Sequence, residues 1–404
     1  MTLLGLGIVF GGLVVAAWSW PWRQLALTWR SARDRRRLLR RLRALQRDVL
    51  LPRSAIVLNE PLDEQTPTTY RFSVLQFNTL ADQYSQQDNN FVQCEPSVLE
   101  FSYRGSLLLA EITREQPDIV CLEEVDKFDF FTEHLKRLGY LGQFLPKRDE
   151  RRMGTADGCA IFYKEDKFAE VRHKGFYFED AAGGTKMSQG ALALELQNTQ
   201  IDKRLLVVVT HLKAKMGHED VRLTQIQQLI KYLQAEWDLF DPSAFDETPL
   251  LTANSQPSQS ASNPQAARSP PDSRPSEPPF PSNRPSGAGD EMTRGPRLPV
   301  IICGDFNSEP HDATPRWLEK HKGLGLVSVY GQESTWPHLT YSTWKIRPNA
   351  EVKRVIDYIW TSPSSLCLLK VLAAPPHDQV PPCRFPNERY PSDHVSLWAE
   401  FSFR

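Results

Sequence analysis

Short apolar runs alternate with helix-like segments along most of the chain. Runs of about four to eight residues that are apolar throughout or at alternate positions are typical of β-strands. They predict strands over residues 71–77, 119–122, 158–163, 191–196, 205–210, 298–303, 355–360, 366–372 and 395–401. Apolar positions three or four residues apart predict helices over 98–115, 128–138 and 219–237. Interleaved strands and helices indicate an α/β domain whose functional site lies in loops at the strand ends.

The first residues follow a different pattern. Residues 3–20 form an uncharged, mostly apolar run about as long as a bilayer crossing requires, and tryptophans at its end suit a membrane interface. We therefore predict an N-terminal hydrophobic helix that acts as a transmembrane anchor over residues 1–22. Basic residues follow this run and none precedes it, so the positive-inside rule places the rest of the chain in the cytosol. The outer mitochondrial membrane and the endoplasmic reticulum both suit this prediction.

Two alternative interpretations of this segment stay open. A cleaved secretory signal fits poorly, because the charge lies on the wrong side of the apolar run and no clear small-residue cleavage site follows. A mitochondrial presequence, with import into the organelle, is the second alternative, because the next segment is rich in arginine and nearly free of acids.

Residues 23–69 form a basic segment and a polar connector. Residues 23–47 contain ten arginines and a single acid, Asp34. A helix with one apolar face is predicted by four leucines at helical spacing, Leu38, Leu39, Leu42 and Leu45. The main domain is predicted to extend from residue 70 to residue 404.

Residues 241–297 interrupt this domain with a different composition. They hold twelve of the chain's 31 prolines, many Ser, Asn and Gln residues, and almost no large aliphatic side chains. Such a stretch cannot bury enough apolar area to offset its ordering entropy. We therefore predict a disordered Pro/Ser-rich insertion that loops out of one domain.

The charge balance and the cysteine spacing limit the kinds of ligand that the chain is expected to bind. The net charge of the 404 residues is −1, and because residues 23–47 are strongly basic, the remainder is mildly acidic. A broad basic surface for long nucleic acid is therefore not expected. The six cysteines lack metal-knuckle or disulfide-scaffold spacing, and Cys121, Cys159 and Cys303 lie in apolar runs, where buried reduced thiols are expected. Nothing in the sequence indicates an oligomer.

Polar residues stand at the ends of the predicted strands, and together they suggest hydrolysis of a phosphate ester. Such a reaction needs charge neutralisation, a positioned water and help for the leaving oxygen. Glu124 is the best candidate ligand for a hard cation such as Mg²⁺. Asn78 can add an amide oxygen near the same ion, and Asp393 can approach it from the opposite side.

Other members of this set suit the chemical step. Asp305 can hold or deprotonate the attacking water, and Asn307 offers amide donors to a phosphoryl oxygen. His211 and His394 supply donors that strengthen as negative charge builds in the transition state. Asp357 is placed to orient the His394 ring and to favour its protonated form.

Each residue also has a purely structural interpretation. Asn78 can be a turn residue, Glu124 can cap the next helix, and His211 can be a hydrogen-bonded core histidine. Residues 304–307 can form a tight turn, and Asp393 can be an ordinary loop residue. Their common position at strand ends makes a metal-dependent phosphoesterase the leading hypothesis.

Further motifs carry a resemblance to a known family. They are Asp88-Asn89-Asn90-Phe91-Val92-Gln93-Cys94, Ala156-Asp157-Gly158-Cys159-Ala160-Ile161-Phe162-Tyr163, Thr210-His211-Leu212-Lys213-Ala214, Thr343-Trp344-Lys345-Ile346-Arg347 and Tyr390-Pro391-Ser392-Asp393-His394. From about residue 71 to the end, apart from the insertion, the chain resembles the endonuclease/exonuclease/phosphatase superfamily, in its deadenylase-like branch.

The resemblance implies an α/β fold of two packed β-sheets flanked by helices, a four-layer sandwich. It implies a Mg²⁺ ion bound through Glu124, with Mn²⁺ as the alternative ion. It also implies a phosphate pocket that contains Lys186 and Arg347, and Lys213 and Lys345 are further candidates for substrate binding. Glu123 stands where the superfamily usually has Gln, which would add a negative charge beside the site.

The branch includes poly(A) 3′-exoribonucleases and a phosphatase that removes the 2′-phosphate from NADP⁺ and NADPH. We expect the phosphatase activity, because a mildly acidic domain suits the small substrate NADP(H) better than a long polyanion. Poly(A) RNA, degraded from its 3′ end in mRNA decay, is the alternative substrate. A membrane-tethered pseudoenzyme that recruits RNA-decay partners is a non-enzyme alternative, and the retained catalytic residue types argue against it.

Overall fold

The computed structural model describes residues 32–404 apart from five internal stretches, 60–69, 86–89, 149–155, 181–183 and 241–296. The predicted anchor over 1–22 and nearly all of the predicted insertion lie outside the described residues. Within the described part of the chain, no helix is long and apolar enough to cross a membrane.

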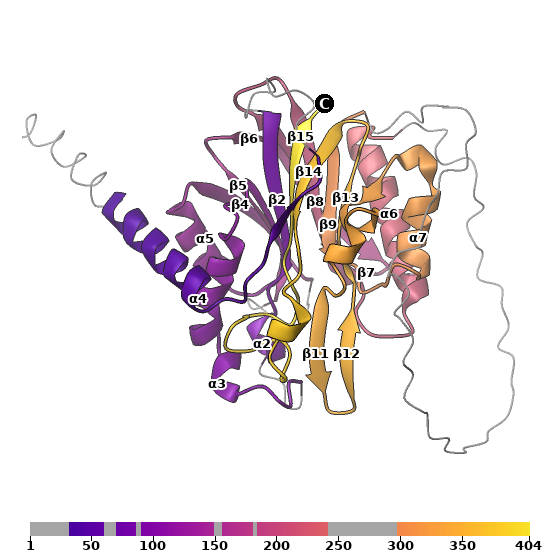
Figure 1. Cartoon of the computed structure of the whole chain (residues 1–404). Helices are drawn as coiled ribbons and strands as arrows, with labels where there is room; N and C mark the ends of the chain where they lie inside the picture. Colours follow the sequence, from indigo (N-terminus) through magenta and orange to yellow (C-terminus); the bar gives the residue numbers. More distant parts are fainter. Residues whose placement is uncertain (1–31, 60–69, 86–89, 149–155, 181–183, 241–296) are drawn as a thin grey trace, which may run out of the picture.

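Two β-sheets form the centre of the structure (Figure 1). The strand order of the seven-stranded sheet is β1 (Ala55–Val57), β14 (Leu366–Leu372), β15 (Leu397–Phe403), β2 (Arg71–Asn78), β3 (Ile119–Val125), β5 (Gly158–Lys164) and β4 (Tyr140–Pro146). The order of the six-stranded sheet is β10 (Val327–Ser328), β13 (Asp357–Thr361), β9 (Val300–Asp305), β8 (Arg204–His211), β7 (Lys186–Asn198) and β6 (Phe168–Glu179). A separate hairpin pairs β11 (Thr343–Arg347) with β12 (Ala350–Arg354).

Helices cover the outer faces of both sheets (Figure 1). The helices beside the seven-stranded sheet are α4 (Phe101–Ile112) and α5 (Phe128–Lys136), and those beside the six-stranded sheet are α6 (Glu219–Trp237) and α7 (Ala313–Lys320). Two short helices, α2 (Asp82–Ser85) and α3 (Pro96–Leu99), follow β2. The predicted four-layer α/β sandwich is therefore confirmed.

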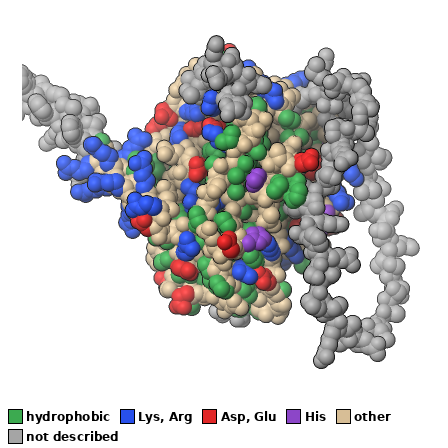
Figure 2. Space-filling view, in the orientation of Figure 1, with side chains coloured by type: hydrophobic (Ala, Val, Ile, Leu, Met, Phe, Trp, Pro, Cys, Tyr) green, Lys and Arg blue, Asp and Glu red, His purple; other side chains and the backbone are tan. Residues whose placement is uncertain are grey.

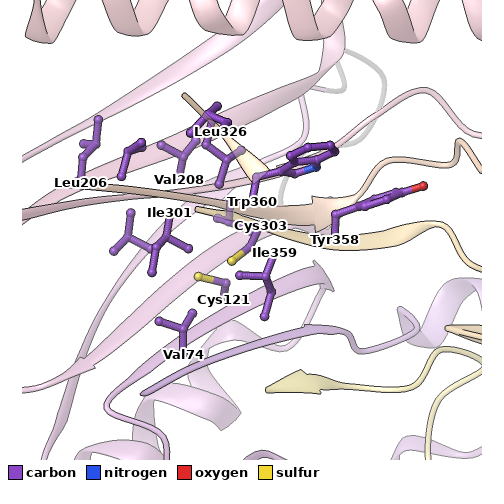
Figure 3. Close-up of a cluster of buried hydrophobic side chains, with 14 of the residues drawn as sticks. Val74, Cys121, Leu206, Val208, Ile301, Cys303, Leu326, Tyr358, Ile359 and Trp360 are labelled. Atoms are coloured by element: carbon purple, nitrogen blue, oxygen red, sulfur yellow. The ribbon is translucent and has the colours of Figure 1, made fainter. Parts of the chain in front are cut away.

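The main core lies between the two sheets (Figure 3). Val74 and Cys121 enter it from the seven-stranded sheet and meet Ile301, Cys303 and Ile359 of the other sheet. Successive side chains of a strand point to opposite faces, so the neighbours of Val74 and Cys121 face the helices instead. Because both faces are covered, the central strands are apolar throughout, as the sequence predicted for 205–210.

The predicted elements are mostly present. All nine predicted strands and helix 219–237 form, with small shifts at the ends. The single helix predicted over 98–115 is wrong, because extended backbone at Glu100 (ψ 138°) separates α3 from α4. Strand β6 escaped prediction because its central positions are charged and exposed, so no apolar run marks it.

The N-terminal segment belongs to the folded body. Residues 32–48 are helical, as their leucine spacing predicted. Leu50 and Leu51 are buried, and β1 adds an edge strand by pairing with β14. Folded structure therefore begins well before residue 70.

Candidate active site

Strand polarity brings the predicted polar residues to one edge of the sandwich. Strands β2 and β3 are parallel, as are β8 and β9, so each pair presents its carboxyl ends together. Asp357 begins the antiparallel strand β13 and lies directly opposite Asp305, which ends β9. The residues that meet at this edge are Asn78, Glu124, His211, Asp305, Asp357, Asp393 and His394.

Asn78 joins the two sheets at this edge. Its Nδ2 donates to Glu124 Oε1 at 3.2 Å and to Asp305 Oδ2 at 3.1 Å. Its Oδ1 accepts a hydrogen bond from the Leu80 amide at 3.1 Å, and Glu124 Oε2 accepts one from the Ala81 amide at 3.0 Å. In this arrangement the amide nitrogen of Asn78, rather than the predicted oxygen, faces the carboxylates.

The backbone at the site edge is unusual. Leu80, Glu124 and Asn307 have positive φ angles of 58°, 53° and 53°. Non-glycine residues adopt this left-handed conformation at a cost of about 1 kcal/mol or more, and such residues cluster at functional sites. At Glu124 the pairing of β3 with β5 is also irregular, so the strand turns its carboxylate toward the site.

His394 and Asp357 form the predicted pair. His394 Nδ1 donates to Asp357 Oδ2 at 2.9 Å, and the other ring nitrogen lies 3.7 Å from Asp305 Oδ2. Burial lowers the pKa of His394, but the carboxylates of Asp357 and Asp305 outweigh burial and raise it to about 9. At neutral pH the ring is therefore a cation with a hydrogen-bond donor at Nε2.

The pKa of His211 is shifted in the opposite direction to that of His394. Its Nε2 lies 3.6 Å from Asp305 Oδ2, and its Nδ1 has no hydrogen-bond partner among the described residues. Burial, with the positive charges of Lys147 and His394, holds the pKa of His211 well below its usual value. One site thus contains a cationic and a neutral histidine, which suits them to different roles.

Asp305 lies between the two histidines. Burial raises its pKa to about 7, and the adjacent His394 cation only partly offsets this effect. Asp305 Oδ1 also accepts a hydrogen bond from the Asn307 amide at 2.9 Å. A carboxylate with a pKa near neutrality is suited to accept a proton from water.

Asp393 is held by cations. Lys345 Nζ lies 2.5 Å and Arg347 Nη2 3.8 Å from Asp393 Oδ2. Burial raises the pKa of Asp393, but Lys345, His394 and Arg347 outweigh it and hold the pKa below its usual value. Arg347 also stacks on Phe91, with its guanidinium carbon 4.7 Å from the ring centre.

The side chains of three predicted residues make no direct contact with this cluster, although the backbone amide of Asn307 contacts Asp305. Lys186 is exposed, and its Nζ pairs with Glu179 Oε1 at 2.7 Å. Lys213 is half-buried just beyond His211. The Asn307 side chain donates from Nδ2 to the Leu212 carbonyl at 3.3 Å.

The structure adds residues that the sequence did not reveal. Lys147 lies 2.5 Å from Asp157 Oδ2 and close enough to Glu124 to lower the pKa of that carboxyl group, although burial raises it overall. Ser342 Oγ donates to Asp357 Oδ2 at 2.6 Å. Neither stands at the end of a predicted apolar run, so no local signal marked them.

The surroundings of Glu123 disfavour the negative charge that the sequence suggested. The residue is fully buried, and Gln76 Nε2 donates to Glu123 Oε2 at 2.8 Å and to Asp357 Oδ1 at 3.0 Å. Burial, with Asp357 nearby, raises the pKa of Glu123 well above its usual value. These surroundings favour the protonated, uncharged form of the carboxyl group, which resembles the amide of a Gln in the same place.

The oxygen-rich centre fits a hard divalent cation. Glu124 and Asp305 both lie against Asn78, and burial raises the pKa of both carboxyl groups. A bound cation would relieve this crowding, and carboxylate and amide oxygens are the ligands that such ions prefer. Asp305, Asp357 and His394 also place potential ligand atoms within 4.8 Å of one another, although His394 Nδ1 is engaged by Asp357.

The fold and this site define the class of protein. Residues 75–394 match the Endonuclease/Exonuclease/phosphatase family, and the chain belongs to that family. Its enzymes are hydrolases of phosphoester bonds and generally depend on a divalent metal ion.

Within the family, the chain has nocturnins among its homologues. It is 32% identical to nocturnin of Xenopus laevis over 369 residues, which cover 89% of this chain and 79% of the relative. It is 32% identical to human nocturnin and spans 65% of that protein's length. The structure of the human nocturnin catalytic domain with bound sulfate superimposes with a TM-score of 0.58 and 26% identity, covering 87% of this chain and 97% of the domain. The Ccr4 3′-5′-exoribonuclease subunit of the CCR4-Not complex from Neosartorya fischeri is 27% identical over 87% of this chain and 50% of the relative.

Proposed function

We propose that this chain is a Mg²⁺-dependent phosphatase that removes the 2′-phosphate from NADP⁺ and NADPH to give NAD⁺ and NADH. One observation carries the proposal: a buried centre of carboxylates adjoins a cluster of cations that can take a single phosphate group. Lys345 and Arg347 supply this positive charge beside Asp393, and His394 adds a further cation.

Each residue has a role in this reaction. Lys345 and Arg347 hold the phosphate, because Arg and Lys form strong charge-assisted bonds to phosphoryl oxygens. Asp305 accepts a proton from the water that attacks phosphorus, and the bond between phosphorus and O2′ breaks. The His394 cation donates from Nε2 to the phosphoryl oxygens as their charge grows, and Asp357 holds the ring in place.

Glu124 and Asp305 would hold the Mg²⁺ ion, and Asn78 would add its amide oxygen only if its side-chain amide turned over. When bound, the ion would supply neutralisation of the phosphoryl charge. The leaving 2′-oxygen takes a proton from solvent or from His394, so charge and atoms balance at the end of the step. Mn²⁺ prefers similar oxygen ligands and is the alternative ion.

A poly(A) 3′-exoribonuclease is the second candidate. Two observations favour it: the similarity to Ccr4 exoribonuclease subunits, and the Arg347–Phe91 stack, since such surfaces accept nucleobases. The mildly acidic composition outside residues 23–47 favours the smaller substrate, because tracking a polyanion needs a row of basic residues.

One assay separates these functions. The full-length protein with Mg²⁺ is offered NADPH and oligo(A) side by side, and released phosphate and shortened RNA are measured. We expect phosphate release from NADPH and intact RNA. Progressive shortening of oligo(A) without phosphate release would establish the exoribonuclease instead. Inactivity on both substrates, with Mg²⁺ or Mn²⁺, would support the pseudoenzyme.

A further inference from the structure

The helix over residues 32–48 divides its surface between leucine and arginine. Leu42 is buried, and Leu38, Leu39 and Leu45 pack beside it. All four join the second hydrophobic core, which lies between the seven-stranded sheet and the helices that cover it. Gln46 ties the helix to α4, since its Nε2 donates to the Ala110 carbonyl at 2.8 Å and to Thr113 Oγ1 at 3.2 Å. The apolar face of the helix is therefore already used inside the protein.

The other face carries an arginine stripe, which we define as Arg33, Arg36, Arg40, Arg43 and Arg47. These residues are three or four positions apart, so they share one side of the helix, and all five are exposed. Figure 2 shows Lys and Arg side chains gathered on this projecting helix.

The stripe has little acidic compensation of its own. Arg47 pairs with Asp48 at 2.7 Å, while the other four make no ion pair with an acid in the part of the chain that the structure describes. Like charges three or four residues apart on a helix repel one another. The arrangement therefore costs helix stability unless an anionic surface lies against it.

Basic side chains also line the space between the helix and the body of the protein. A cavity of about 280 Å³ lies between them, with four basic residues and a single acid in its lining. These residues are Arg35, Arg43, Arg114, Lys164 and Asp166. Arg114 and Lys164 are already paired with Glu111 and Asp118, so the uncompensated positive charge of this region comes mainly from the helix.

The stripe lies away from the active site. Helix α4 has 12 residues and is about 18 Å long at the usual rise per residue. Near its start, Arg104 donates to the carbonyls of Thr79 and Pro391, beside the site. Gln46 contacts the opposite end of α4 at Thr113. An anionic partner on the stripe is therefore distinct from the substrate.

We propose that the arginine stripe is a docking surface for an anionic lipid bilayer. The uncharged run over residues 3–20 closes with tryptophans, and Trp22 is ten residues from the first described residue of the helix. Even a fully extended connection of that length spans at most about 35 Å, so an inserted run would hold the helix near the lipid surface. Each arginine within about a Debye length of an anionic leaflet is attracted to it.

The test uses the full-length protein with the apolar run interrupted by Leu13→Asp and Val15→Asp, because buried acids oppose bilayer insertion. With insertion of this run prevented, binding of the protein to vesicles should depend on the arginine stripe. Co-sedimentation is measured with vesicles of phosphatidylcholine alone and with vesicles that contain roughly one third phosphatidylserine. We expect binding to the anionic vesicles, weakening as salt is raised, and none to the neutral vesicles.

A triple variant in this background, Arg33→Gln with Arg36→Gln and Arg40→Gln, tests the stripe directly. Each arginine contributes about fivefold to partitioning near an anionic surface, and because the contributions saturate we expect a loss of at least about tenfold. The matched control removes three exposed charges from α6 and α7, Lys231→Gln, Arg316→Gln and Lys320→Gln. The control should bind like the parent, and both variants should melt like the parent because the replaced side chains are exposed.

Several results would overturn the proposal. They are equal binding to neutral and anionic vesicles, an unchanged affinity of the stripe variant, and an equal loss in the control. Salt-sensitive binding of the stripe to oligo(A), without binding to vesicles, would assign the surface to nucleic acid. These outcomes are binding measurements that do not depend on catalytic activity. Membrane docking is therefore tested independently of the phosphatase activity.

Discussion

A buried ion-pair network behind the site gives the sharpest prediction, for the variant Glu111→Gln. The Glu111 carboxylate is fully buried and lies 2.7 Å from both Arg53 Nη1 and Arg114 Nη2. It also accepts hydrogen bonds of 2.9 Å from the hydroxyl groups of Tyr390 and Ser396. These two residues flank the segment that carries Asp393 and His394, so the network supports the site from within.

The size of the effect follows from the shift in the pKa of Glu111. Burial raises this pKa, but Arg114 and Arg53 outweigh burial and lower it from 4.5 to about 2. Such a difference between the folded and unfolded chains corresponds to about 3 kcal/mol of stability at neutral pH. Because the folded pKa is depressed, this stability is present above pH 4.5 and is lost as the pH falls toward 2.

Urea unfolding of the wild type and of Glu111→Gln, followed by tryptophan fluorescence, measures this effect. We expect the variant to be less stable by about 3 kcal/mol at pH 7, because the Arg53 charge stays buried without its partner. The difference should shrink below pH 4.5. Glu133→Gln is the control: Glu133 pairs with Arg137 on the exposed surface, and its loss should cost under about 1 kcal/mol. A loss in Glu111→Gln no larger than in the control, or a difference independent of pH, would refute the reasoning.

Three further predictions concern the reaction, measured as phosphate release from NADPH by the full-length protein. Glu124→Gln should abolish turnover while leaving the unfolding curve unchanged, and full activity at saturating Mg²⁺ would exclude Glu124 as a ligand. His394→Ala should lower kcat roughly 10²–10⁴-fold, with a smaller loss for Asp357→Asn, which keeps the imidazole but not its carboxylate partner. A change in KM alone would assign the pair to binding. Arg347→Ala should raise KM roughly tenfold or more, since it removes a charged phosphate contact, and an unchanged KM would place the phosphate elsewhere.

Much of the site could be predicted because many of its residues stand at the ends of strands. An apolar strand must end where its side chains leave the core, so a polar residue at that point is visible locally, as with Asn78 and Glu124. The pairing of Asp357 with His394 was predicted from residue types and is confirmed by the 2.9 Å contact. The assignment of Asp393 beside a metal remains a prediction, and the described structure adds Lys345 and Arg347 as its immediate partners.

Local periodicity alone thus determined nine of the strands, the α/β class and the leucine face of the helix at 32–48, because side-chain burial repeats every two or about 3.6 residues along one segment. Tertiary structure decided the charge of each group. The sequence contains no sign that His211 is neutral while His394 is a cation, or that burial raises the pKa of Glu123. These states depend on desolvation and on charges carried by strands far apart in the chain, and both are set only when the two sheets close on each other.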